Sequence, residues 1–268
     1  MIERETVNNS ALSLGIIVQA RVGSTRLPGK VLLDFHQGQS ILDLVLQKFN
    51  APEFANLKKI LATSTASGDQ VLSAYAEKYG YNFFQGSEQD VLQRFIQAAE
   101  DNGLTHIIRV CADNPLLNSE SVGDLLAALQ AGQETGHTPD YVSYKTSAGI
   151  PVIKSHLGLF TEIVSVEALK QTAARTADPL YHEHVTNYIY ADGHGFNVEL
   201  VPAPQAVYDR ADLRFTIDDQ EDFENIARLY SHTAAFGEDL KKLVSFVDAH
   251  EESRYKRTMI DNIKKYTK

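Results

Sequence analysis

Residues 14–30 read LGIIVQARVGSTRLPGK, an apolar run followed by a loop with glycine, proline and basic residues. The run at 14–20 is short and rich in β-branched side chains, which is typical of a buried parallel strand. Ligands of open parallel sheets bind outside the carboxyl ends of the strands. The loop at 21–30, with its cations Arg21, Arg26 and Lys30, is therefore the first place where a ligand is expected.

Strand-like and helix-like segments alternate along the rest of the chain. Strands are expected at 59–63, 81–84, 106–110, 140–144, 196–201 and 213–217, and helices at 40–48, 69–79, 88–100, 119–131, 165–174 and 221–230. Residues 182–190 fit either type, and a terminal helix is expected within 251–268. Such alternation predicts right-handed βαβ units. The expected fold class is α/β, a doubly wound, mostly parallel sheet with an inserted small subdomain at 140–207.

Length, charge and cysteine content narrow the class of protein. The 268 residues suit one large domain at 14–268, preceded by a polar N-terminal extension at 1–13. A net charge of −10 disfavours nonspecific nucleic-acid binding, which needs a basic surface. The single cysteine, Cys111, excludes an internal disulfide and fits a reducing cytoplasm. No apolar run reaches the ~20 residues that cross a bilayer, so a cytoplasmic protein without a membrane partner is expected.

The loop at 21–30 has the composition of a phosphate site. Gly23 allows close approach of a ligand to the backbone, and the loop cations supply the charge that a triphosphate requires. The spacing is not that of a Walker loop. A solvated basic loop is the alternative interpretation, but the combination of cations with glycines, Ser24 and a preceding buried strand favours phosphate binding.

Residues 17–32, with the core ARVGSTRLPGK, resemble the opening signature of the cytidylyltransferases that activate acidic sugars. These are the CMP-Kdo and CMP-sialate synthetases, and the best match is to the related spore coat polysaccharide biosynthesis protein F family. The resemblance implies a nucleotide-diphospho-sugar transferase-like fold in which this loop holds CTP. The nucleotide-binding residues that it implies here are Ala20, Arg21, Gly23, Ser24, Arg26 and Lys30.

Two further segments resemble blocks of the same family. Residues 109–116, RVCADNPL, are similar to R-x-T-x-D-x-P-L, which implies that Asp113 binds Mg²⁺ and that Arg109 contacts the nucleotide. Residues 213–223, LRFTIDDQEDF, are similar to L-R-x-T-V-D-T-P-E-D-F, which implies Asp218 as the second metal ligand. Taken alone, Asp113 fits a turn before a proline equally well. Asp219 is interpreted as the cap of the next helix, and Asp222 as a first-turn residue of that helix.

Weaker matches concern the base and the acceptor. Residues 84–95 resemble G-S-x-x-D-V-L-x-R-Y, which implies that Gly86 shapes the base pocket; the alternative is a helix start capped by Ser87, with Asp90 and Arg94 paired. Thr63 is expected either to donate a hydrogen bond to the base or to cap a turn. The resemblance also assigns the acceptor to Glu162, Glu183 and His184, and makes 140–207 an acceptor and dimerisation subdomain of a homodimer.

The expected activity is transfer of CMP from CTP to a small anionic acceptor such as a sugar acid, with release of pyrophosphate. Arg21, Lys30, Asp113 and Asp218 are the expected catalytic residues and Mg²⁺ the cofactor. A metal-dependent glycosyltransferase of the same architecture is one alternative, although no D-x-D motif ends a strand. A non-catalytic nucleotide-binding subunit is the other. A zinc hydrolase is discounted because the H-E-x-x-H spacing is absent.

Overall fold

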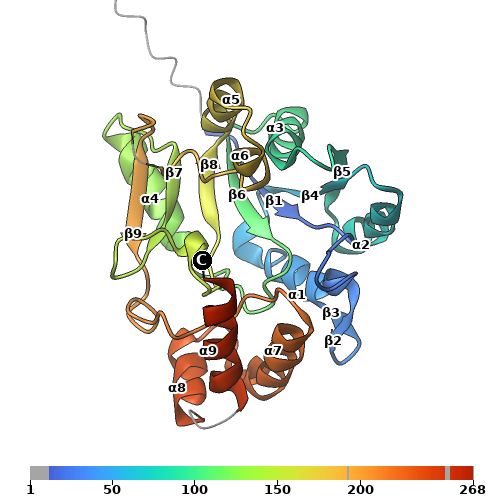
Figure 1. The fold of residues 1–268 in the computed structure, drawn as a ribbon. Helices are drawn as coiled ribbons and strands as arrows, with labels where there is room; N and C mark the ends of the chain where they lie inside the picture. The colour runs from blue at the N-terminus through green and yellow to red at the C-terminus, as the bar shows by residue number, and fades with distance from the viewer. Residues whose placement is uncertain (1–11, 192, 251–253, 268) are drawn as a thin grey trace, which may run out of the picture.

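A seven-stranded sheet runs through the middle of the molecule (Figure 1). The computed structural model describes residues 12–191, 193–250 and 254–267, so most of the expected extension at 1–13 lies outside the described residues. The strand order is β5-β4-β1-β6-β8-β7-β9. The strands are β1 (Leu14–Gln19), β4 (Lys58–Ser64), β5 (Asn82–Gly86), β6 (His106–Cys111), β7 (Tyr141–Lys145), β8 (Glu162–Ser165) and β9 (Val198–Pro202). A separate hairpin joins β2 (Asp34–His36) to β3 (Gln39–Ser40).

Most of the sheet is parallel, as the alternation of segments predicted. The strands β5, β4, β1 and β6 all run in the same direction. The exception is β8, which pairs antiparallel with both β6 and β7, and β9 pairs parallel with β7. Residues 140–207 thus contribute three strands to the same sheet. The α/β fold class predicted from the sequence is confirmed.

Helices cover both faces of the sheet and extend below it in Figure 1. They are α1 (Ile41–Lys48), α2 (Leu72–Tyr79), α3 (Val91–Asp101), α4 (Val122–Glu134), α5 (Val166–Arg175), α6 (Pro179–Glu183), α7 (Gln220–Thr233), α8 (Leu240–Ala249) and α9 (Arg254–Tyr266). Single 3₁₀ turns lie at Lys30–Leu32, Pro52–Phe54, Ser67–Val71, Val152–Lys154 and Ala234–Phe236. One apolar cluster joins α1, α2, α4 and α7 to one face of the sheet, and a second joins α3 and α5 to the other.

Two expectations for local structure differ from the observed fold. Residues 213–217 form no strand of the sheet, and Phe215 N donates instead to His156 O at 3.0 Å. Leu213, Phe215 and Ile217 are buried in the core, so their period of two reflects burial of an extended segment rather than strand pairing. Residues 182 and 183 are the end of α6, and residues 184–190 are bends and turns, so the segment is neither one long helix nor a strand.

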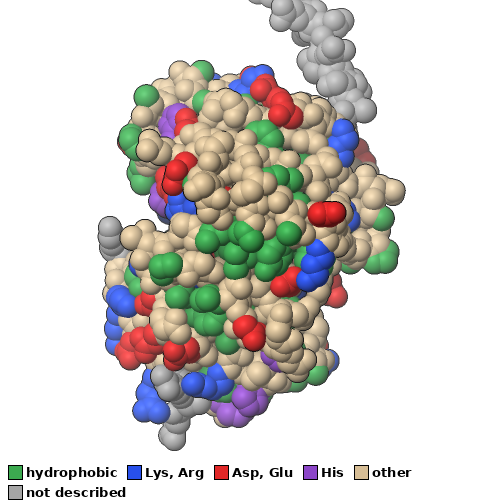
Figure 2. All heavy atoms as spheres, turned by 90° about the vertical axis from the view of Figure 1, so that its right-hand side faces the viewer, with side chains coloured by type: hydrophobic (Ala, Val, Ile, Leu, Met, Phe, Trp, Pro, Cys, Tyr) green, Lys and Arg blue, Asp and Glu red, His purple; other side chains and the backbone are tan. Residues whose placement is uncertain are grey.

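Within the residues that the structure describes, no helix is both long and apolar enough to span a bilayer. Figure 2 shows the side of the molecule that carries α2 and the β2–β3 hairpin. On this face, basic and acidic side chains are scattered among hydrophobic and polar ones and form no continuous basic patch.

The start of α1 shows how local sequence positions an element of the core. Ser40 Oγ accepts from Asp43 N at 3.1 Å, and Asp43 Oδ2 accepts from Ser40 N at 2.9 Å, which completes a capping box. Asp43 Oδ1 also accepts from Lys78 Nζ and Tyr79 Oη, both at 2.7 Å, and so joins α1 to α2. Burial alone would raise the pKa of Asp43, but hydrogen bonds from Lys78, Ser40 and Tyr79 lower it to about 2.

Replacing this carboxylate tests the contact between α1 and α2. We expect Asp43→Asn to lower the free energy of unfolding at pH 7 by about 1–3 kcal/mol, because hydrogen bonds to a charged group are lost. The pKa of Asp43 is lower in the folded protein than in the unfolded chain. Its stabilisation is therefore complete above about pH 4 and is lost as the pH falls towards 2.

Urea unfolding of both proteins at pH 7 and at pH 3 measures this effect. The difference in unfolding free energy between wild type and Asp43→Asn should shrink at the lower pH. A difference that stays constant between the two pH values would contradict the assigned role of the carboxylate.

Candidate active site

A cleft of about 570 Å³ lies at the carboxyl ends of β1 and β6. Its lining contains most of the residues that the sequence motifs single out. The predicted site residues that line it are Ala20, Arg21, Ser24, Arg26, Lys30, Arg109, Asp113, Glu183, His184 and Asp218. Gln19, Thr25, Val31, Cys111 and Ala112 complete the lining. Segments separated by more than 180 residues in the chain thus meet in one cleft, although the segment before Asp218 is not a strand of the sheet.

Lys30 connects three of these segments. Its Nζ donates to Asp113 Oδ2 at 2.8 Å and to Ile217 O at 2.7 Å. Gly29, immediately before it, has a φ of +69°, a left-handed conformation that favours glycine. Gly29 N donates to Val22 O at 3.0 Å and closes the loop on itself. The lysine therefore projects from a shaped loop towards the end of β6.

Asp218 is held by an arginine on each of its carboxylate oxygens. Arg26 pairs with Oδ1, and Arg214 donates to Oδ2 at 2.7 Å. Arg214 is buried, with 1% of its side chain exposed, and Asp222 receives two hydrogen bonds from it, at 3.0 and 2.6 Å. Asp222 Oδ2 also accepts from Asp218 N at 2.9 Å. Asp222 is therefore more than a first-turn helix residue, because it fixes the arginine that orients Asp218.

Arg214 and Asp222 are the residues of this network that the sequence interpretation did not assign to the site. Both stand inside the quoted block at 213–223. An arginine in an otherwise apolar segment is a usable signal, because a buried guanidinium needs hydrogen-bond acceptors nearby and a carboxylate is often one of them. The neighbouring Asp219 behaves as expected: its Oδ1 accepts from Asp222 N at 2.9 Å and caps α7.

The carboxylates of Asp113 and Asp218 fit a hard divalent cation that is shared with a phosphate ligand. Both line the same cleft, and both are now neutralised by cations of the loop at 21–30. Across the described ranges, no group of three or more histidine, cysteine, aspartate and glutamate side chains could hold a metal ion. Mg²⁺ commonly binds through one or two carboxylates and completes its shell with phosphate oxygens and water, which matches this donor set.

The buried carboxylate of Asp69 holds the loop at 21–30 at its first residues. This carboxylate, 2% exposed, accepts from Val22 N at 2.7 Å, from Thr63 Oγ1 at 2.9 Å and from Ser64 Oγ at 2.5 Å. Burial alone would raise the pKa of Asp69, but the hydrogen bonds from Ser64, Val22 and Thr63 lower it. Thr63 is fully buried and does not line the cleft, so its contact with the loop runs through Asp69.

Gly86 and Gly23 also lie outside the cleft lining. A Cβ on Gly86 would come within 2.8 Å of Arg94 Cγ, so a glycine is needed for close packing. Arg94 is fully buried, and its Nε donates to Ser87 O at 2.9 Å. Asp90 does not pair with Arg94: it caps α3 and pairs with His182 Nδ1 at 2.8 Å.

Arg109 forms the floor of the cleft on the side of β8. Its NH1 donates to Glu162 Oε1 at 2.6 Å, directly across the β6–β8 pairing. Glu162, 1% exposed, also accepts from Tyr141 and Thr186 and does not line the cleft itself. The arginine Nε is buried and has no hydrogen-bond partner among the described residues. Glu162 thus positions Arg109 rather than facing the cleft.

The short helix α6 supplies the opposite wall. Glu183 pairs with Arg21 at 3.2 Å across the cleft mouth, and His184 lines the cleft beside it.

Cys111, at the end of β6, also lines the cleft. Burial raises the pKa of its thiol, which keeps the thiol protonated and unsuited to nucleophilic chemistry.

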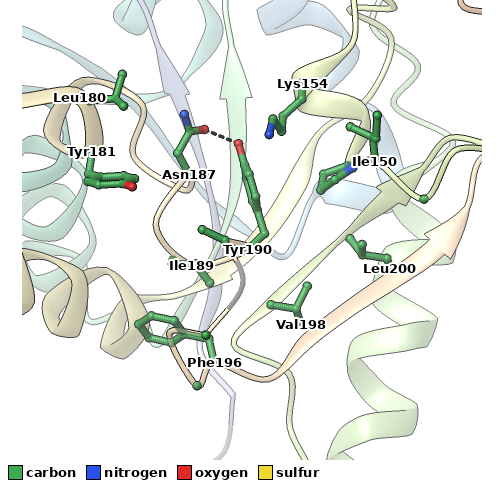
Figure 3. Close-up of a pocket in the computed structure, with 15 residues that line it drawn as sticks. Ile150, Lys154, Leu180, Tyr181, Asn187, Ile189, Tyr190, Phe196, Val198 and Leu200 are labelled. Atoms are coloured by element: carbon green, nitrogen blue, oxygen red, sulfur yellow. Dashed lines mark hydrogen bonds between the residues drawn. The ribbon is translucent and has the colours of Figure 1, made fainter.

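A second cavity, of about 750 Å³, is lined in part by Leu180 and Tyr181 of α6 and by Val198 and Leu200 of β9 (Figure 3). It falls within residues 149–200, between the end of α6 and the strand β9. Its lining is Gly149, Ile150, Pro151, Lys154, Leu180, Tyr181, Asn187, Ile189, Tyr190, Ala191, Gly193, Gly195, Phe196, Val198 and Leu200. None of the predicted site residues lines this cavity.

Residues 15–252 match the family model described as cytidylyltransferase. The chain belongs to the cytidylyltransferase family. Membership makes it a CTP-dependent nucleotidyltransferase, as the motifs at 17–32, 109–116 and 213–223 predicted. The glycosyltransferase and the non-catalytic subunit are therefore disfavoured.

Individual relatives agree with this family. The chain is 33% identical over 218 residues to the spore coat polysaccharide biosynthesis protein SpsF of Bacillus subtilis, covering 80% of this chain and 85% of that protein. It is 27% identical over 197 residues to a 3-deoxy-manno-octulosonate cytidylyltransferase of Aeromonas hydrophila, covering 68% and 77%.

Among solved structures, a cytidylyltransferase from Leptospira borgpetersenii superposes with a TM-score of 0.77 at 25% identity, covering 90% of this chain and 96% of that one. A CMP:2-keto-3-deoxy-manno-octonic acid synthetase complexed with CTP has a TM-score of 0.57 at 17% identity, covering 82% and 99%, and shares the fold.

Removing the Asp69 carboxylate tests how the loop at 21–30 is held. We expect Asp69→Asn to lower the free energy of unfolding by about 1–3 kcal/mol, because buried donors lose a charged acceptor. Trypsin should then cleave the Arg21–Val22 bond faster, since Val22 N donates to a neutral amide oxygen in place of a carboxylate and is held less firmly. The matched variant Thr63→Val removes one of these hydrogen bonds and should have a smaller effect on both measurements. Equal cleavage rates in wild type and Asp69→Asn would show that the loop is fixed elsewhere.

Proposed function

We propose that the cleft binds CTP and transfers its CMP to an oxygen of a small anionic sugar acid, with release of pyrophosphate. The observation that carries this proposal is the meeting of Lys30 with Asp113 and with the backbone of Ile217, immediately before Asp218. A triphosphate-binding loop and two carboxylates then face one another across a single cleft. The names of the relatives, a spore coat polysaccharide protein and an octulosonate cytidylyltransferase, support an acidic sugar as the acceptor.

Nucleotidyl transfer depends on positioning and charge neutralisation. The acceptor oxygen attacks the α-phosphorus of CTP, and the bond to the leaving pyrophosphate breaks. Arg21, Arg26 and Lys30 are placed to neutralise the phosphates and the leaving group. Mg²⁺, when held by Asp113 and Asp218, supplies further positive charge at the reacting phosphate.

Binding of the triphosphate requires an exchange of partners. Arg26 and Lys30 now neutralise Asp218 and Asp113, and a bound triphosphate competes with those carboxylates for the same cations. The carboxylates of Asp113 and Asp218, freed from these cations, are the groups that would hold a divalent metal ion beside the phosphates. Nucleotide and metal are therefore expected to bind more tightly together than either does alone.

The acceptor half of the proposal concerns the side of the cleft formed by Arg109 of β6 and by the end of α6. Arg109 presents a cation on the floor there, and Glu183 and His184 line the adjoining wall. A guanidinium fixed by a buried carboxylate suits the carboxylate of a sugar acid. A neutral sugar, which has no carboxylate, would lack this contact.

The metal role of Asp113 can be tested by pyrophosphate release from CTP with Mg²⁺ across a panel of sugar acids. We expect Asp113→Asn to lower kcat about 100-fold or more while the melting temperature stays near that of the wild type, because a preorganised charge at the reacting centre is lost. Asp101→Asn, an exposed carboxylate at the end of α3, is the matched control and should leave kcat unchanged. Near-normal turnover by Asp113→Asn would refute the role.

We also propose that residues 140–207 pair two copies of the chain, with the second cavity at the contact. Two of the large hydrophobic side chains that the described residues expose, Ile150 at 45% and Leu180 at 52%, line this cavity. The strand β9 leaves one edge of the sheet open next to it. An exposed apolar patch beside an open edge strand favours association with another copy.

Light scattering after gel filtration tests this pairing. We expect the wild type to have the mass of a dimer and Leu180→Asp to shift towards the monomer, because a charge would be buried in the contact. Val71→Asp places the same charge at a side chain of similar exposure, 50%, outside this cavity and should leave the mass unchanged. A monomeric wild type would refute the proposal.

A further inference from the structure

The last helix of the chain, α9, ends against the active-site cleft. Its residues lie beyond the segment 15–252 that the family model matches. Near its end, the ring of Tyr266 lies under two guanidinium groups, 5.0 Å from Arg26 Cζ and 4.8 Å from Arg214 Cζ. The two arginines that stack on Tyr266 are those that hold the two oxygens of Asp218.

The ring of Tyr266 is itself held in place through its hydroxyl group. Its hydroxyl donates to Asp219 Oδ2 at 2.7 Å, and the neighbouring Lys265 donates to the same oxygen at 2.6 Å. Asp219 also caps α7, which begins directly after the carboxylate segment. The tyrosine therefore joins α9 to the start of α7 and, through the arginines, to Asp218.

The docking of α9 does not depend on Tyr266. Earlier in the helix, Met259 and Asn262 are buried at 1% and 2% exposure, and Asn262 Nδ2 donates to Asp222 Oδ1 at 2.7 Å. Tyr266 is only partly buried. Substituting its side chain should consequently leave the helix in place and change mainly the arginines that rest on the ring.

Of the two arginines, Arg26 depends more on the Tyr266 ring for its position. Its side chain is 55% exposed, and its partners among the described residues are Asp218 and the Tyr266 ring. A long exposed side chain loses conformational entropy when it binds a phosphate. Stacking on an aromatic ring restricts the side chain before binding, so less entropy is lost, and it adds a cation–π attraction. Arg214, by contrast, is already fixed by Asp222 and His156.

We infer that Tyr266 is a positioning residue of the nucleotidyl transfer, holding Arg26 at the rim of the cleft where the triphosphate binds. This inference rests on the proposed function. It assigns to the C-terminal helix a part in phosphate binding that the motifs of the family do not contain. The contact acts through Arg26, so Tyr266 itself need not touch the nucleotide.

The test compares Tyr266→Leu with Tyr266→Phe. Calorimetric titration measures the affinity for CTP, with and without Mg²⁺, and for inorganic triphosphate; steady-state kinetics give KM and kcat. We expect Tyr266→Leu to weaken binding of both phosphate ligands about three- to tenfold, the scale of one cation–π contact. KM for CTP should rise by a similar factor with little change in kcat. Tyr266→Phe keeps the ring and should restore affinity to within about twofold of the wild type.

Two controls separate positioning from folding. Ile260→Ala alters an exposed side chain of the same helix and should change neither affinity nor KM. In an Arg26→Ala background, Tyr266→Leu should have no further effect on triphosphate binding, because the tyrosine acts through that arginine. An undiminished effect in that background, or equal losses in the Phe and Leu variants, would overturn the inference.

The outcomes also separate this inference from the proposed function. Wild-type protein that binds inorganic triphosphate but does not turn over CTP would refute the proposed function and leave the role of Tyr266 measurable. Wild-type affinity in Tyr266→Leu, together with normal CTP turnover, would refute only the role of Tyr266. A wild type that binds neither ligand would refute both.

Discussion

The ammonium group of Lys30 is the contact on which the rest of the cleft depends. Two of its three N–H donors bond to Asp113 and to the backbone of Ile217, which joins the loop after β1 to the end of β6 and to the segment before α7. Asp69 holds the other end of the loop through Val22. With the loop fixed at both ends, its arginines line the cleft although their side chains stay partly exposed.

Charge in this cleft is arranged in pairs. An acidic chain cannot attract a triphosphate through its overall field, so the phosphate charge has to be met locally. Each loop cation has a carboxylate partner, which keeps the ligand-free cleft from accumulating unbalanced positive charge. The same pairing orders the long side chains of the loop, so that less conformational entropy is lost when a ligand binds.

Much of this arrangement could be predicted from the sequence, because parallel strands bring their carboxyl ends to one edge. That rule placed the loop at 21–30 and Asp113 together. It failed for residues 213–217, whose apolar alternation reflects burial in the core and not strand pairing. Contacts that depend on side-chain direction were also out of reach: Glu162 faces Arg109 rather than the cleft, and nothing in the sequence indicated that Tyr266 would return to Arg26.

The reversed direction of β8 has a consequence for how such an enzyme can diversify. Because β8 runs against β6, its first residue, Glu162, stands beside Arg109 at the edge of the sheet where the parallel strands end. After β8 the chain runs through α5 before Glu183, at the end of α6, and His184 reach the cleft. The wall opposite the triphosphate loop is therefore encoded by separate, later segments. Under the proposed function, exchange of the loops around β8 and α6 would alter which acceptor is bound and leave the loop that holds the nucleotide unchanged.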